Sequence, residues 1–167
     1  CEGDDDAYMG AREELETASL LTVRDGFCDK HRLLQQVVRE AMSETDLQAQ
    51  ILVVQTVLHS EASKIDDDDP KTWLLCSQLD SHVSAWSSWA WQQGGKSMKG
   101  EDVLSLSAEM LRTVGAAYRH MGQYQAAHRL VSNALEWAKV LGVKHSEYLS
   151  TLNNMANIKG DQGDYEG

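Results

Sequence analysis

The sequence predicts a mainly α-helical chain, in which a small N-terminal module with a short β-hairpin precedes helices that pair and stack. Three observations support this. The 167 residues include one proline and one phenylalanine, a composition that favours helices. Apolar residues recur at spacings of three and four along most of the chain. A short pattern also recurs near the C-terminus at a fixed interval, which is typical of stacked repeats.

Charge and composition exclude several kinds of partner. The net charge of −11 argues against nucleic acid and anionic membranes, because both need a basic face. We find no apolar stretch long enough to span a bilayer and no signal peptide. Three scattered cysteines are typical of reduced thiols, so we expect a cytoplasmic protein. Because residue 1 is Cys and the sequence stops within a repeat, we expect a piece of a longer protein.

The N-terminal residues predict a helix followed by a hairpin. After the acidic lead CEGDDD, a short helix is expected around Ala11–Ala18. The runs Leu20–Val23 and Phe27–Lys30 flank a short connection that contains Gly26. A glycine-bearing connection between two such runs indicates a β-hairpin.

A second helix should follow the hairpin, from His31 to Met42. One face of it would carry the apolar residues Leu34, Val37, Val38 and Ala41. Helix, hairpin and helix in so short a space resemble part of a winged-helix domain. We therefore expect residues 1–43 to form a partial winged-helix module.

Residues 44–100 predict a helical linker region. Ser43 and Asp46 are typical of a helix N-cap, and the apolar stripe of this helix would be Leu47, Ile51, Val54, Leu58 and Ala62. Farther on, Asp69 can cap a helix that begins at Pro70. That long helix would bury Trp73, Cys76, Leu79, Val83, Trp86 and Ala90.

The stretch AWQQGGKS, Ala90–Ser97, fits a permissive pattern for a nucleotide-binding P-loop. A P-loop needs a buried strand before it and a helix directly behind it. Here Ala90 ends a predicted helix, and MKGED delays the next one. We interpret the stretch as a polar linker. The alternative is a nucleotide-binding protein that uses this loop.

A pattern in VGAAYRHMGQYQAA (114–127) recurs in MANIKGDQGDYEG (155–167). Three pairs share one offset of 41 residues: Gly115 and Ala156 (156 − 115), Gly122 and Gly163 (163 − 122), and Tyr124 and Tyr165 (165 − 124). A fixed period between about 20 and 50 residues indicates stacked helical repeats. Small residues at 115 and 127 would let two helices approach closely, and Tyr118 would fill the junction between repeats.

The same region resembles the tetratricopeptide repeat of the kinesin-light-chain type. The residues that carry this resemblance are VLG-x-x-H, TLNNMAN and DQGDY, with Leu111, Gly115, Tyr118, Ala127 and Ala134 at the packing positions. The resemblance implies an α-α superhelix over residues 101–167, with one full repeat and one partial repeat. Lys159 departs from the family, which usually has tyrosine at this position.

The upstream segments resemble another family. Three segments, REELETASLLTV, HRLLQQVVRE and DPKTWLLCSQLDSHVSAW, are similar in this order to parts of NLR-like signal-transduction ATPases, of the NB-ARC or NACHT type, that end in tetratricopeptide repeats. The resemblance implies a regulatory and protein-binding segment of such an NTPase, whose parent protein would bind ADP or ATP and could oligomerise. The alternative is an adaptor of the kinesin-light-chain type without a switch domain.

His31 is the candidate for nucleotide sensing in the parent protein. In the resembled family, a histidine at this position senses the phosphates of bound ADP. An imidazole at a helix start beside Lys30 and Arg32 can meet a phosphate. Both neighbours depart from the family motif, and the alternative is a histidine that caps the helix or packs at the edge of the domain. We expect no bound cofactor in this segment.

The other candidate site is a groove lined by the first helix of each repeat. By position, Arg112, Ala116, Arg119, Asn153 and Asn157 should face it. Asparagine amides can bind an extended peptide backbone, and arginines would favour acidic partners. An ordinary solvated surface is the alternative. We therefore expect a protein or peptide ligand.

Metal binding and catalysis are not indicated. Cys28, His31, Cys76 and His82 lack the two tight pairs of a zinc site, and the acidic run at 66–69 lacks the glycine and distal glutamate of a calcium loop. The sequence pairs no serine or cysteine with a histidine, so we expect no enzyme activity in this segment. The tryptophans should anchor the core.

Overall fold

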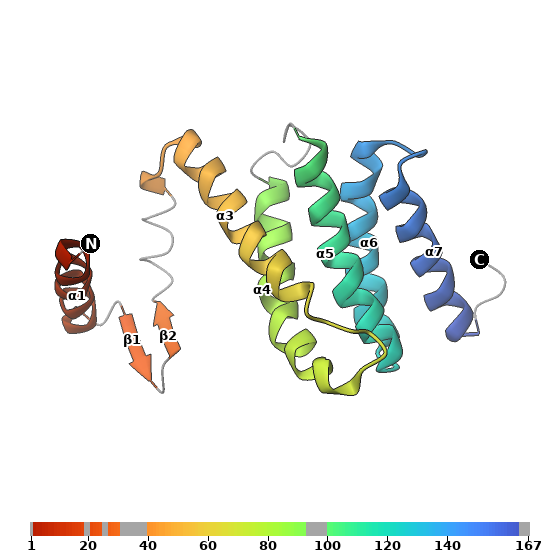
Figure 1. The fold of residues 1–167 in the computed structure, drawn as a ribbon, viewed down its shortest axis with the longest axis horizontal. Coiled ribbons are helices and arrows are strands. Elements are labelled where there is room, and N and C mark those ends of the chain that lie inside the picture. Colours follow the sequence, from red (N-terminus) through yellow and green to blue (C-terminus); the bar gives the residue numbers. More distant parts are fainter. Residues whose placement is uncertain (1, 19–20, 25–26, 31–39, 93–99, 164–167) are drawn as a thin grey trace. The chain divides into compact units, whose positions relative to one another are not determined.

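The computed structural model describes residues 2–18, 21–24, 27–30, 40–92 and 100–163. It is mostly helical and divides into two compact units, Cys1–Gln48 and Ala49–Gly167. Figure 1 shows the elements of both units. Within the described residues, no helix is both long enough and apolar enough to cross a membrane.

The N-terminal unit begins with helix α1, Glu2–Thr17. This helix starts well before the expected Ala11. Four of the first six residues are acidic, and negative charge is favourable near a helix N-terminus. Farther along, Arg12 Nε lies 2.7 Å from Glu16 Oε1 one turn away, which supports the helix.

The predicted hairpin is confirmed, with a shift at one end. Strands β1, Leu21–Arg24, and β2, Phe27–Lys30, are antiparallel, and Arg24 is paired with Phe27. Two residues therefore connect the strands instead of the expected three, and Asp-Gly is the sequence that two-residue hairpins favour. Most of the helix expected at His31–Met42 lies outside the described residues, so the winged-helix module stays a prediction.

Helix α3, Glu44–Ala62, begins at the predicted cap. Ser43 Oγ accepts a hydrogen bond of 3.1 Å from the backbone N–H of Asp46 and donates one of 2.6 Å to its carboxylate. This pairing satisfies one of the unpartnered donors at the start of the helix.

The apolar stripe predicted for α3 is partly wrong. Ile51, Leu58 and Ala62 are buried, but Val54 is 37% exposed and Gln55 is buried in its place. Gln55 Nε2 donates hydrogen bonds to Val103 O at 2.6 Å and to Ser107 Oγ at 2.8 Å in the next helix pair. These bonds offset the cost of burying the amide.

A short 3-10 turn, η1, Pro70–Thr72, leads into helix α4, Trp73–Gln92. The Asp69 side chain accepts from Lys71 N at 3.0 Å, as expected for a cap before Pro70. The predicted apolar stripe is confirmed: Trp73 is half-buried, and five positions are buried, at Cys76, Leu79, Val83, Trp86 and Ala90.

Three further helices follow, α5 Glu101–His120, α6 Tyr124–Leu141 and α7 Ser146–Asp161. The 41-residue period appears in the backbone, because Gly122 after α5 and Gly163 after α7 have φ of 71° and 77°. Glycine adopts this left-handed conformation at no steric cost, which explains its place at both helix ends.

Helices α5 and α6 approach closely at Gly115. A Cβ atom added there would lie 2.7 Å from Val131 Cγ2 and 3.4 Å from the carbonyl oxygen of Ala127. The predicted role of small residues at 115 and 127 is thereby confirmed. Tyr118 is 6% exposed, as expected for a residue that fills the junction with α4.

The pair α3–α4 repeats the pattern of α5–α6. We call α3 and α5 the first helices of their pairs, and α4 and α6 the second helices. Buried positions of α3 and α5 correspond at an offset of 53 residues (111 − 58): Ile51 and Leu104, Gln55 and Ala108, Leu58 and Leu111, and Ala62 and Gly115. In the second helices they correspond at 51 (137 − 86): Cys76 and Ala127, Leu79 and Leu130, Val83 and Ala134, and Trp86 and Trp137. Residues 49–163 thus hold two helix pairs and the first helix of another.

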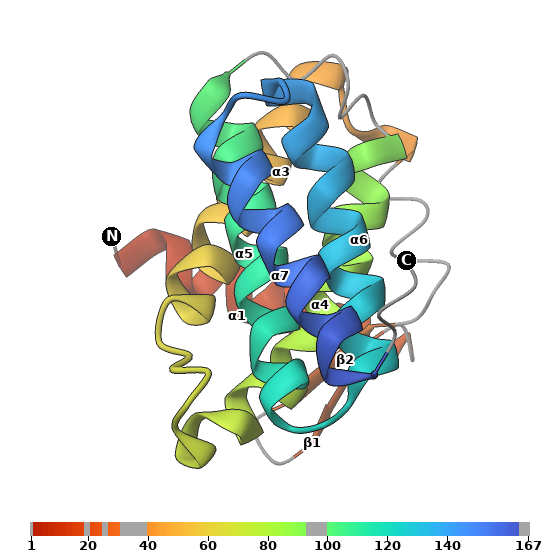
Figure 2. The same ribbon diagram turned by 90° about the vertical axis from the view of Figure 1, so that its right-hand side faces the viewer.

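The first helices form one layer of this unit and the second helices form the other. In Figure 2, α3 and α5 lie on one side, and α4 and α6 lie on the other. Two tryptophans join the second helices, because the rings of Trp86 and Trp137 stack with centroids 5.7 Å apart. The Trp86 indole also donates to Ile51 O at 3.1 Å, which joins the two layers. The expected role of these tryptophans as core anchors is confirmed.

Candidate protein-binding surface

A row of partly exposed polar and charged pairs joins α3, α5 and α7, the first helices of successive pairs. His59 on α3 faces Glu109 on α5, Arg112 on α5 faces Glu147 on α7, and Arg119 on α5 faces Asp161 on α7. We call the surface that carries these six residues the first-helix face. Each pair links two neighbouring helices among α3, α5 and α7.

Arg112, a predicted groove residue, is held against α7. Its Nε atom lies 3.5 Å from Glu147 Oε2, and the two side chains are 25% and 17% exposed. The Glu147 backbone N–H in turn donates to His145 Nδ1 at 3.2 Å, so His145 caps α7. The Arg112 charge is therefore already compensated within the chain.

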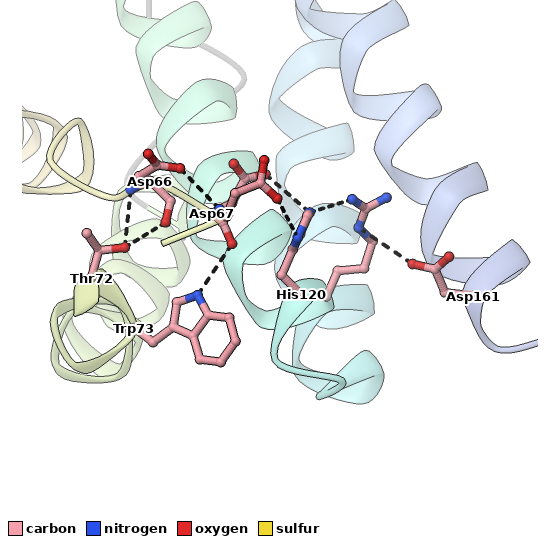
Figure 3. Close-up of polar contacts among 8 residues, drawn as sticks. Asp66, Asp67, Thr72, Trp73, His120 and Asp161 are labelled. Carbon is pink, nitrogen blue, oxygen red and sulfur yellow. Dashed lines mark hydrogen bonds and ion pairs between the residues drawn. The ribbon is translucent and has the colours of Figure 1, made fainter. Parts of the chain in front are cut away.

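Arg119, the second predicted arginine, takes part in a polar network at the end of α5. Its Nε lies 3.7 Å from Asp161 Oδ2, and its Nη2 donates to His120 Nε2 at 2.6 Å. The His120 ring also lies against the acidic run: its Nδ1 is 3.0 Å from Asp68 Oδ1, and its Nε2 is 3.6 Å from Asp67 Oδ2. Figure 3 shows this network reaching from α7 to the loop after α3.

Asn153 and Asn157 lie on α7 and are exposed. Asn153, Asn157 and Asp161 follow one another at intervals of four residues, so the three share one face of the helix. That position lies beside the ion pairs of α5 and α7 and leaves both amides open to solvent. The third asparagine of this run, Asn154, is half-buried.

The acidic run after α3 is organised by its own hydrogen bonds. Thr72 Oγ1 donates to Asp66 O at 2.6 Å, and the Trp73 indole donates to Asp67 O at 3.3 Å (Figure 3). Within the described residues, Asp66, Asp67 and Asp68 form a group of carboxylates whose oxygens lie within 4.8 Å of one another. Asp67 and Asp68 lie beside His120, and Asp66 Oδ1 accepts a hydrogen bond of 3.1 Å from Asp68 N.

The residues weighed for chemistry lie apart or outside the described region. His31 lies outside it. Cys76 is fully buried, and its thiol donates to Val114 O at 3.6 Å, whereas His82 is exposed. Burial, with a further contribution from Asp80, raises the pKa of the Cys76 thiol to about 12. A thiol of this kind is a poor nucleophile and a poor metal ligand at neutral pH.

The P-loop-like stretch begins inside a helix. Ala90, Trp91 and Gln92 form the end of α4, and residues 93–97 lie outside the described residues. A P-loop would need a strand at this point, so the helix supports the interpretation of this stretch as a linker.

Sequence reasoning missed His59 and Glu109, because α3 was interpreted as part of a linker. His59 Nε2 lies 3.3 Å from Glu109 Oε2. The two residues border a cavity of about 200 Å³ between α3 and α5. The sequence feature that could have revealed them is the 53-residue offset between α3 and α5. It is recognised only with the structure, because several residues at matched positions differ in type.

Comparison with known proteins identifies the C-terminal part of the chain. Residues 106–167 match the tetratricopeptide repeat family. The match includes most of α5 and all of α6 and α7, so the tetratricopeptide resemblance is confirmed for this region. Tetratricopeptide repeats generally mediate protein–protein interaction. Comparisons with curated proteins and with solved structures found no match.

Proposed function

We propose that the chain is a protein-binding segment that holds a partner on the first-helix face. The tetratricopeptide match of residues 106–167 carries this proposal. The exposed amides of Asn153 and Asn157 support it, because each can donate to and accept from an extended peptide backbone. Arg112 and Arg119 would link α5 to α7 instead of binding the partner, since their charges are paired with Glu147 and Asp161.

Selection of displayed random peptides on the immobilised chain tests this function. We expect enriched peptides to bind saturably and the double variant Asn153→Ala, Asn157→Ala to weaken binding about tenfold or more. The matched control, Gln125→Ala with His128→Ala at exposed positions of α6, should leave affinity within twofold. Failure to enrich any saturable binder, or equal loss in both double variants, would reject the first-helix face as the binding surface.

We further propose that the segment belongs to an NLR-like signal-transduction ATPase in the cytoplasm. In that protein His31 would sense bound nucleotide, and partner binding would be coupled to the switch. The support is the ordered resemblance of three segments, together with the hairpin directly before His31. An adaptor of the kinesin-light-chain type would have no switch domain.

The parent sequence and one variant test this assignment. We expect a strand with a complete phosphate-binding loop upstream, followed by an acidic metal-site strand. His31→Ala in the parent protein should speed ADP release, as measured with a fluorescent nucleotide. A parent without such a loop, or with unchanged ADP release, would contradict the assignment.

We also propose that this segment has no catalytic centre and holds no nucleotide of its own. The helix over Ala90–Gln92 supports this, because a strand should precede a phosphate-binding loop. An ATP titration should therefore show no saturable binding that Lys96→Ala removes. Such Lys96-dependent binding would overturn the proposal.

A further inference from the structure

Helix α3, which is continuous from Glu44 to Ala62, carries an exposed stripe. Six exposed residues recur along it at alternating intervals of four and three: Asp46, Gln50, Val53, Val57, Ser60 and Lys64. Lys64 lies in the turn directly after the helix. Intervals of this kind keep residues on one side of a helix, as in the seam of a two-stranded coiled coil. We call these six residues the α3 seam.

The α3 seam and the first-helix face lie on different sides of the helix. Val57 lies two positions before His59, and such residues point in nearly opposite directions at 3.6 residues per turn. His59 pairs with Glu109 of α5, so the seam points away from α5. Ile51 and Leu58 occupy the buried side of α3. A partner on the seam would therefore leave the first-helix face free.

The middle of the seam is apolar. Val53 and Val57 are 57% and 58% exposed and lie on adjacent turns of α3. Association through the seam would remove this apolar surface from water, which is favourable. Gln50 and Ser60, on either side of the valines, are polar and uncharged.

The ends of the seam carry opposite charges. Asp46 lies at one end and Lys64 at the other, and both are exposed. Each has one partner in its own chain, because Asp46 accepts a hydrogen bond from Ser43 and Lys64 pairs with Glu61. A carboxylate has several acceptor sites and an ammonium has three donors, so each can take a further partner.

This order of residues makes the seam complementary to itself. In an antiparallel pair of α3 helices with a twofold axis level with residue 55, each charge meets its opposite and each valine meets a valine. The contacts across the axis would be Asp46 with Lys64, Gln50 with Ser60, and Val53 with Val57. A parallel pair would instead place like charges together, which is unfavourable.

We infer that a second copy of this chain packs on the α3 seam and forms an antiparallel homodimer. The valines supply the apolar centre, and the end charges set the orientation. Because the apolar centre is small, the dimer is weak and transient. The inference goes beyond the proposed function, since it uses another side of α3 and needs no bound peptide.

Sedimentation equilibrium of the whole chain tests the apolar centre. We expect reversible dimerisation between micromolar and millimolar concentrations. Val57→Asp should weaken it about tenfold or more, because it would bury a charge in the middle of the contact. Leu74→Asp on α4 is the matched control. Leu74 is 69% exposed and lies outside the seam, so the dimerisation constant should stay within twofold.

Charge reversal tests the antiparallel orientation. Lys64→Glu alone places two acids at each end of the contact, and Asp46→Lys alone places two bases there. Each variant by itself should therefore dimerise about tenfold more weakly than the unaltered chain. Mixed together, the two variants should associate within about threefold of the unaltered chain, because both ends again pair opposite charges. Circular dichroism confirms that each variant is folded.

Three results would overturn the inference. The first is a chain that stays monomeric at millimolar concentration, which would leave the seam to a different occupant. The second is an equal effect of Val57→Asp and Leu74→Asp. The third is a pair of charge variants that dimerise like the unaltered chain and gain nothing from mixing.

Discussion

Gly115 shows how one residue sets the distance between two helices. The nearest atoms to a Cβ at this position are Val131 Cγ2, the Ala127 carbonyl oxygen and Leu130 Cβ, at 2.7, 3.4 and 3.4 Å. Val131 is fully buried and β-branched, so its side chain cannot turn away easily. The hydrogen at Gly115 is therefore what lets α5 and α6 pack at this separation.

Replacing Gly115 should therefore destabilise the chain, although alanine is the better helix former. Alanine gains about 1 kcal/mol of helix propensity, but overpacking costs about 1–3 kcal/mol. We expect Gly115→Ala to lower the free energy of unfolding by up to about 2 kcal/mol in urea titrations. Gly160→Ala in α7 is the control, because nothing lies within 4 Å of a Cβ there. Equal effects of the two substitutions would contradict this explanation.

Two buried acids respond to alkaline pH. Burial, aided by Asp80, raises the pKa of Cys76 from 9.0 to about 12. Burial also raises the pKa of Tyr118 from 10.0 to about 12, again with a contribution from Asp80. The unfolded chain thus loses these protons at a lower pH than the folded chain does.

The free energy of unfolding should consequently be independent of these groups below about pH 9 and fall as the pH rises from 9 toward 12. Each group can contribute a slope of up to about 1.4 kcal/mol per pH unit. Urea titrations between pH 8 and 11 should show the fall. Cys76→Ala should make it shallower from pH 9 upward, and Tyr118→Phe from pH 10 upward. Unchanged slopes in both variants would exclude these residues as the cause.

At the scale of elements, spacing predicted helices well and predicted their buried faces less well. The stripe of α4 is correct because every buried residue on it is apolar or small. The stripe of α3 is wrong at Val54 and Gln55 because tertiary hydrogen bonds decide which of the two is buried. A single sequence does not show that Val103 O and Ser107 Oγ will lie within hydrogen-bonding distance of the Gln55 amide.

Helix α7 is less well covered than its counterpart α5. Nine residues of α5 are buried, against two of α7, Thr151 and Ile158. Residues of α7 and α5 that match at the 41-residue offset show the difference in exposure. Leu149 and Leu152 of α7 are 55% and 39% exposed, and their counterparts in α5 (149 − 41 = 108; 152 − 41 = 111) are fully buried. Within the described residues, no second helix covers this face of α7.

Hydrogen exchange should reveal this difference between the first helices. In the monomeric chain we expect amides of α7 to exchange at least tenfold faster than those of α5 and α6, because local opening of α7 exposes little apolar surface. Mass spectrometry of peptic fragments over 101–120, 124–141 and 146–161 measures this. Protection of α7 equal to that of α5 would count against it.

At the scale of the whole molecule, the sequence predicted that α5 and α6 form a repeat, whereas the matching arrangement of α3 and α4 was recognised only in the structure. The 41-residue period predicted α5, α6 and α7, because glycine and small residues recur at a constant offset. The pair α3–α4 follows different intervals, 53 and 51 residues (111 − 58; 137 − 86), because the connections after α3 and after α4, 63–72 and 93–100, are longer than those after α5 and α6, 121–123 and 142–145. Its residues also differ chemically, since Gln55 replaces Ala108 and Ala62 replaces Gly115. His59 and the cavity were missed for this reason.

The two helix pairs contact each other through polar and aromatic side chains of α4 and α6. Asp80 of α4 accepts two hydrogen bonds of 2.9 Å from Arg129 of α6. The Trp137 indole donates to Ser87 Oγ at 3.0 Å, in addition to its stacking on Trp86. These contacts give the second helices a shared core that neither pair could bury alone.

Removing the first pair should consequently unfold the second. We expect a chain of residues 101–167 to lose cooperative thermal unfolding and much of its helical circular dichroism, because stacked repeats need roughly three units to bury a continuous core. A chain of residues 43–167, which keeps α3 with its Ser43 cap and α4, should melt cooperatively near the temperature of the full chain. The comparison isolates the stacking contacts, since α5, α6 and α7 are identical in both. If 101–167 melted as cooperatively as 43–167, α5, α6 and α7 would fold without α3 and α4, and the proposed dependence between the two helix pairs would be wrong.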